Sequence, residues 1–86
     1  MKTTIITGNE VAINYAFSKL TGYGHHKIIV ELDFAGEFKT FSKTTNNMPA
    51  FDEANDLEGE DKWEALYNII ANDIEDEVAE WIEELN

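Results

Sequence analysis

The residues most able to do chemistry in this 86-residue sequence are two adjacent histidines, His25 and His26, which follow Gly24. Imidazole nitrogens are common zinc ligands, but a zinc site takes three or four protein ligands. The sequence contains no cysteine, and no further ligand stands at a spacing typical of zinc sites. We therefore interpret the two histidines as the entry into a strand, and we expect no metal and no other cofactor.

Patterns for calcium, phosphate and catalysis also fail. Counted from Asp52, Gly59 is the eighth residue, whereas a calcium-binding EF-hand loop needs glycine at its sixth position. The segment Gly22-Tyr23-Gly24 is not followed by the Gly-Lys-Ser/Thr of a phosphate-binding loop. Acid–base catalysis needs paired carboxylates in a cleft. We expect the carboxylates of this sequence to lie on an exposed helix face instead. We predict that the protein is not an enzyme and has no catalytic residues.

The acidic residues are concentrated in the last part of the chain. Eighteen Asp and Glu against six Lys, with no Arg, give a net charge of −12. Residues 1–50 hold five Lys and four acids, whereas residues 51–86 hold one Lys and fourteen acids. Because phosphates are bound by Lys and Arg, we expect no direct binding to nucleic acid or to an anionic membrane. No apolar run reaches the ~20 residues of a membrane span, so we expect a cytoplasmic protein.

From Glu60 onward, apolar residues recur every three or four positions, as on one face of an α-helix. A disordered acidic tail would not keep such a pattern in phase. We therefore predict one amphipathic helix over residues 60–85, with a break near Asn72 as the alternative. Its apolar face consists of Trp63, Leu66, Tyr67, Ile70, Ile74, Val78, Trp81, Ile82 and Leu85.

Three strands are predicted in the first half of the chain. Residues 2–7 are rich in β-branched side chains, which favour a strand. Residues 27–34 alternate between two sets of side chains, as the two faces of a strand do. The pair Ala35-Gly36 predicts a tight turn, and residues 37–45 then form the returning strand.

A short helix is predicted between the first two strands, because four apolar residues follow helical spacing and Gly22 suits a helix end. Residues 46–59 predict a loop with a helical turn over 51–55. Phe38 and Phe41 are out of step for strict alternation, which predicts a β-bulge between them. The four apolar residues of the short helix are Ile13, Ala16, Phe17 and Leu20.

These elements predict a single α+β domain over residues 1–86. The expected order is β-α-β-β-α, with a three-stranded sheet and both helices on one of its faces. A sheet of three strands needs such a helical cover to be stable.

The face of the C-terminal helix opposite its apolar residues is acidic. Like charges stand four residues apart along it, and each such pair destabilises a helix by about 0.2–0.5 kcal/mol. No lysine follows Lys62, and anions near the helix C-terminus oppose the helix dipole. The face costs about 2 kcal/mol in all. We take its carboxylates as candidate partner-binding residues: Asp61, Glu64, Asp73, Glu75, Asp76, Glu80, Glu83 and Glu84.

In size, acidity and possession of a folded acidic helix, the chain resembles small mobile-element inhibitors that act as DNA mimics, such as anti-CRISPR and anti-restriction proteins. The resemblance is carried by Glu60–Asn86, EDKWEALYNIIANDIEDEVAEWIEELN. It implies a non-enzymatic inhibitor whose acidic helix binds a basic protein surface on a nuclease, a restriction enzyme or a CRISPR effector. A straight helix of 25 residues would be about 37 Å long, close to one turn of B-DNA.

The alternative is a structural or assembly module, either a homodimer or a subunit of a larger complex. In that case the acidic face would serve only solubility. Trp81 and Ile82 would then form an apolar patch at the C-terminal end. We expect instead that these residues, together with Trp63, Tyr67 and Phe51, lie in the core. Salt separates the two functions, because it weakens charged contacts and leaves apolar ones intact.

Overall fold

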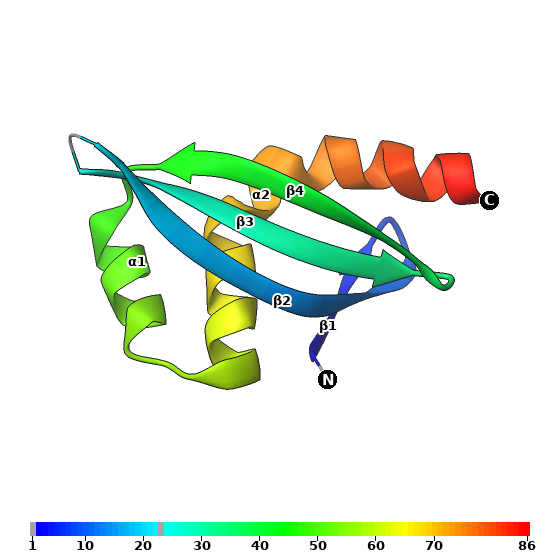
Figure 1. Cartoon of the computed structure of the whole chain (residues 1–86). Coiled ribbons are helices and arrows are strands. Elements are labelled where there is room, and N and C mark those ends of the chain that lie inside the picture. Colours follow the sequence, from blue (N-terminus) through cyan, green and yellow to red (C-terminus); the bar gives the residue numbers. More distant parts are fainter. Residues whose placement is uncertain (1, 23) are drawn as a thin grey trace.

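The computed structural model describes residues 2–22 and 24–86 as an antiparallel sheet followed by two helices, an α+β arrangement (Figure 1). The sheet has four strands, and their order in the sheet follows their order in the sequence. The elements are β1 (Lys2–Ile6), β2 (Asn9–Gly22), β3 (His25–Phe34), β4 (Glu37–Thr45), α1 (Met48–Asn55) and α2 (Gly59–Leu85).

The helix predicted from Ile13 to Leu20 is wrong, because these residues belong to the 14-residue strand β2. The predicted order β-α-β-β-α and the three-stranded sheet are therefore also wrong. The register between β2 and β3 shifts between Ile13 and Tyr15, which marks a β-bulge. The bulge places the buried residues Ile13 and Ala16 three positions apart, and this spacing imitates a helix. The β-branched and aromatic residues around it favour a strand.

The strands predicted over 2–7, 27–34 and 37–45 and the long C-terminal helix are confirmed to within two residues at each end. The bulge predicted between Phe38 and Phe41 is wrong, because β4 pairs continuously with β3. The two side chains lie on opposite faces of the sheet. Phe41 is 5% exposed and belongs to the core, whereas Phe38 is 67% exposed.

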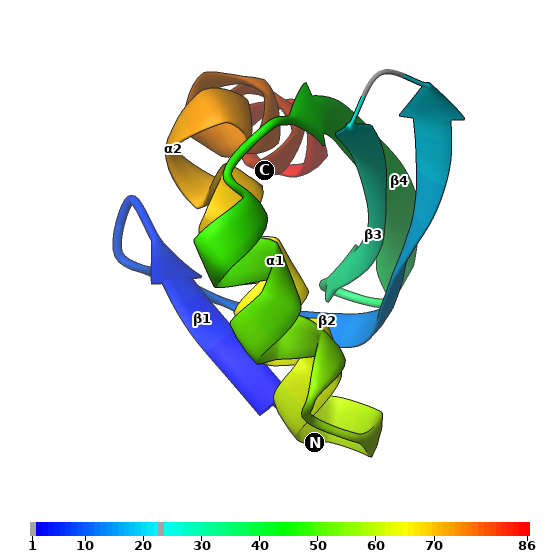
Figure 2. The same cartoon turned by 90° about the vertical axis from the view of Figure 1, so that its left-hand side faces the viewer.

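The sheet curls around α2, and the core fills the concave side of the sheet (Figure 2). Alternate residues of β3, namely Ile28, Val30 and Leu32, are fully buried against this side. From α2, Ile70 and Ile74 are also fully buried. Both helices lie on the concave side, so the convex face of β2 and β3 has no helix against it in the described part of the chain (Figures 1 and 2).

Helix α2 is continuous over its 27 residues but strongly bent (Figure 1). Its first part, drawn in yellow, and its second part, drawn in orange and red, run in different directions. Buried residues continue through the bend at Ile70 and Ile74, so one helix follows the curled sheet with its apolar face inward. The alternative break near Asn72 does not interrupt the helix, and the helix is not the straight rod considered above.

The turn between β3 and β4 offers a direct test of local strain. Ala35 and Gly36 have φ angles of 55° and 82°, the combination that a two-residue type I′ hairpin needs. A residue with a Cβ atom pays about 1–2 kcal/mol there, and asparagine is tolerated better. We expect Ala35→Asn to raise the free energy of unfolding by about 0.5–1 kcal/mol in urea titrations. Gly36→Ala should lower it, and equal stability of all three proteins would contradict this account of the turn.

Candidate functional site

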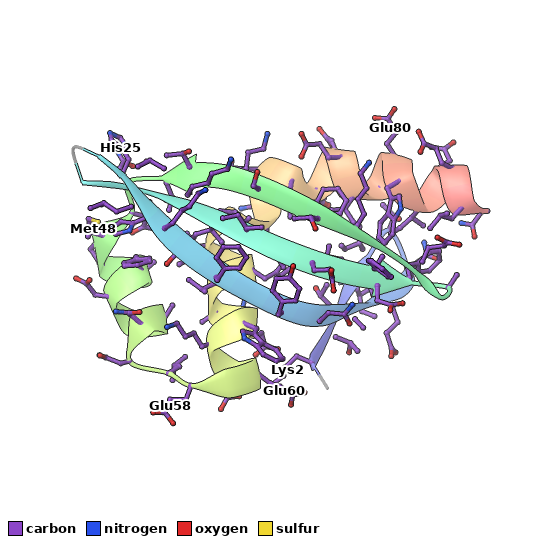
Figure 3. The ribbon with its side chains drawn as sticks, viewed as in Figure 1. Lys2, His25, Met48, Glu58, Glu60 and Glu80 are labelled. Atoms are coloured by element: carbon purple, nitrogen blue, oxygen red, sulfur yellow. The ribbon has the colours of Figure 1, made fainter. Side chains whose placement is uncertain are left out.

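The second part of α2 presents a surface of exposed carboxylates. Its inward side is fixed by Ile74 and Val78, both fully buried, and by Trp81 and Ile82, which are 6% and 2% exposed. The acidic side chains are therefore held on the outer side of the helix, and Glu80 points away from the sheet (Figure 3). We call this surface the acidic ridge, and it consists of Asp73, Glu75, Asp76, Glu80, Glu83 and Glu84.

The carboxylates of the acidic ridge form no ion pair with any residue in the described ranges 2–22 and 24–86. The neighbouring Glu77 differs, because Lys43 Nζ on β4 lies 3.3 Å from its Oε1. No basic residue occupies the last turn of α2, where Glu83 and Glu84 oppose the helix dipole. The ridge thus concentrates negative charge that the fold itself does not neutralise.

Two of the eight candidate residues lie elsewhere and have a cation beside them. Lys2 Nζ is 3.1 Å from Asp61 Oδ1 and 3.9 Å from Glu64 Oε1. The hydrogen bond to Asp61 and the charge of Glu64 raise the pKa of Lys2 above its ordinary value of 10.5. Lys2 and Glu60 lie at the lower edge of the molecule in Figure 3, whereas Glu80 lies at its upper edge. The structure therefore groups six candidate residues in the ridge and separates Asp61 and Glu64 from them.

Tyr67 lies on the buried side of the first part of α2 and is 4% exposed. Burial raises the pKa of its hydroxyl above 10.0, while a hydrogen bond with Thr4 acts in the opposite direction and the charge of Glu75 adds to the rise. A proton held more tightly in the folded state stabilises the fold below the unfolded pKa, and that stability is lost as pH rises through the folded pKa.

We therefore expect the free energy of unfolding to fall above about pH 10, and Tyr67→Phe should make that fall shallower. Urea titrations between pH 8 and pH 11.5 measure it. Equal slopes for wild type and Tyr67→Phe would contradict this role of Tyr67.

The two histidines have separate surroundings. The ring of His26 stacks on Phe51 of α1, with centroids 3.9 Å apart and planes 18° apart, whereas His25 is exposed. No cluster of three or more His, Asp or Glu suited to a metal ion occurs among residues 2–22 and 24–86. A groove of about 370 Å³ lies between α1 and α2, where Asn47, Leu57 and Asn68 are part of its lining, and neither histidine lines it.

The aromatic residues of the helices lie mostly in the core, as expected. Trp81 packs edge-on against Phe34 and Phe41, with ring centroids 6.4 and 5.8 Å apart. Tyr67 and Phe51 are buried, and Trp63 is half-buried against the core. The apolar patch considered at Trp81 and Ile82 is not exposed, so these two residues do not offer a dimer contact.

Sequence reasoning missed the exposed aromatic residues on the convex face of the sheet. Tyr15 and Phe17 stack on each other, with ring centroids 6.0 Å apart, and Phe17 is 46% exposed. The helix predicted for this segment concealed them. The signal that identifies them is the alternation of Tyr15, Phe17 and Lys19, which puts all three on one face once the segment is a strand.

No protein-family model, curated protein or solved structure matches this chain. Within the described residues, no helix combines the length and the apolar character that crossing a membrane requires.

Proposed function

We propose that this chain is a non-enzymatic inhibitor that binds the positively charged, nucleic-acid-binding surface of another protein through its acidic ridge. The observation that carries the proposal is the set of six exposed carboxylates without an ion-pair partner among the described residues. Channels for nucleic acid are lined by Lys and Arg, so they attract such a surface. Nucleases, restriction enzymes and CRISPR effectors are the partner classes with this chemistry.

The destabilisation that the acidic ridge imposes on α2 favours binding of a partner, rather than solubility, as the role of the ridge. Like charges four residues apart and anions in the last turn destabilise α2 by about 2 kcal/mol. Solubility requires only a net charge. Acids spread over the whole surface, with lysines among them, would supply a net charge without destabilising α2. Here fourteen of the eighteen acids stand in residues 51–86, and six form one surface. Recognition of a basic partner accounts for that concentration.

The bend of α2 restricts the size of the complementary surface. The ridge runs from Asp73 to Glu84, about 17 Å along the helix axis at 1.5 Å per residue. One strand of B-DNA places roughly five phosphates over that length, and the ridge offers six carboxylates. We therefore propose that the ridge replaces about half a turn of the nucleic acid, rather than the full turn that a straight helix would match.

A pull-down with matched baits tests the proposal. The two baits are the wild-type protein and a variant with the six ridge acids changed to Asn or Gln, used on a cell extract at about 50 mM and 500 mM salt. We expect nucleic-acid-binding proteins on the wild-type bait only, at low salt only, and we expect added duplex DNA to release them. Capture of the same proteins by both baits, or retention in the presence of DNA, would contradict the proposal.

A further inference from the structure

The convex face of β2 and β3 carries an exposed apolar centre. Phe17 of β2 stands opposite Ile29 of β3, and Tyr15 stands opposite Glu31. The Tyr15 and Phe17 rings stack with 18° between their planes. Tyr15 is 36% exposed, Phe17 is 46% exposed and Ile29 is half-buried. Stacked aromatic residues left in water are typical of the centre of a protein–protein interface.

Charges of opposite sign stand at the two ends of this centre. At one end, Lys19 of β2 lies opposite Lys27 of β3. At the other end, Glu31 is followed on the same face by Asp33, beside which Phe38 of β4 is exposed. Among residues 2–22 and 24–86, neither lysine has an ion-pair partner, and neither does Asp33. We call these residues the convex strip: Tyr15, Phe17, Lys19, Lys27, Ile29, Glu31, Asp33 and Phe38.

The convex strip is complementary to itself under a two-fold axis. Lys27 and Asp33 are six residues apart on β3, roughly 20 Å at 3.3 Å per residue. When two copies face each other and one is rotated by 180° about an axis that crosses the strands, each lysine end meets the acidic end of the other copy. The Tyr15–Phe17 stacks then meet at the centre. A two-fold interface requires one patch that matches itself in this way.

We propose that the protein forms a homodimer in which two convex strips face each other, with Lys19 and Lys27 of each copy against Glu31 and Asp33 of the other. The acidic ridge does not oppose this contact, because α2 lies on the concave side of the sheet (Figure 2). Charges farther apart than the Debye length, about 8 Å at physiological salt, are largely screened. The dimer leaves both ridges uncovered, so each copy keeps its proposed partner-binding surface.

Charge reversal gives a test with a built-in rescue. The first variant is Lys19→Glu with Lys27→Glu, and the second is Glu31→Lys with Asp33→Lys. Each alone places like charges in contact at both ends of the dimer, whereas an equimolar mixture restores two complementary ends. Sedimentation velocity between about 5 and 500 μM measures the mass of each sample. Circular dichroism checks that each variant is folded. This check is needed because Glu31→Lys removes a hydrogen bond that Glu31 Oε2 accepts from Asn14 Nδ2 at 3.1 Å.

The expected result is a wild-type dimer, two monomeric variants, and recovery of the dimer in the mixture. Phe17→Ser, which changes no charge, should also give a monomer. A wild type that stays monomeric at 500 μM overturns the proposal. That result is also the one expected if a different protein, and not a second copy, binds the convex strip. The proposal is equally overturned when both reversed variants still dimerise, or when their mixture does not.

Discussion

Replacing Trp81 with alanine is expected to lower the free energy of unfolding by about 3–5 kcal/mol. Trp81 is 6% exposed and meets Phe34 and Phe41 edge-on, so the substitution leaves a large cavity between the last turns of α2 and the sheet. A domain of this size has a total stability of about 4–13 kcal/mol. The variant is therefore expected to be partly or wholly unfolded at 37 °C.

Thermal and urea unfolding followed by circular dichroism measure this effect. Leu85→Ala is a suitable control, because Leu85 lies one turn further along the same helix and is 36% exposed. The control should lower stability by only about 1 kcal/mol, because Leu85 is partly exposed and leaves no enclosed cavity. A loss below 1 kcal/mol for Trp81→Ala would contradict the assignment of this tryptophan as the anchor that holds the ridge in place.

Reversing four acids of the ridge to lysine is expected to weaken binding to a captured basic partner at least a hundredfold, about 2.8 kcal/mol. The four positions are exposed and none belongs to the core, so the substitutions mainly change charge. They also give α2 cations near its C-terminus and several opposite-charge neighbours, so stability should be kept or increased. The variant carries Glu75→Lys, Asp76→Lys, Glu80→Lys and Glu83→Lys.

A second quadruple variant separates the ridge from net charge. It reverses four exposed acids in and beside α1, so that both variants change the net charge from −12 to −4. We expect this control to bind nearly as well as wild type, because only long-range attraction changes. Equal loss of binding in both variants would show that overall charge, and not the ridge, makes the contact. The control carries Asp52→Lys, Glu53→Lys, Asp56→Lys and Glu58→Lys.

The long helix could be predicted because its apolar spacing stays in phase over many turns, from Trp63 to Ile82. Strand β2 could not, because a single bulge after Ile13 shifts the buried set by one residue and so produces helical spacing. The turn at Ala35-Gly36 was predictable from its glycine, whereas the bend of α2 follows from the curvature of the sheet that it covers.

In the candidate site, too, some features could be predicted from the sequence and others could not. The outward direction of Glu80 and its neighbours follows from the buried stripe of the same helix, so the sequence was sufficient. The separation of Asp61 and Glu64 from the ridge needed the tertiary structure, because it depends on the bend and on Lys2 of β1. The convex strip was out of reach once its central residues, Tyr15 and Phe17, had been assigned to a helix.

We propose above all that the acidic ridge and nucleic acid compete for one basic surface. The most direct test of this competition titrates a captured partner with fluorescent duplex DNA at several fixed concentrations of this protein. We expect the apparent Kd for DNA to rise linearly with the concentration of this protein, and we expect no complex that contains all three components. An unchanged Kd for DNA, together with a stable complex of partner, DNA and this protein, would contradict the proposal.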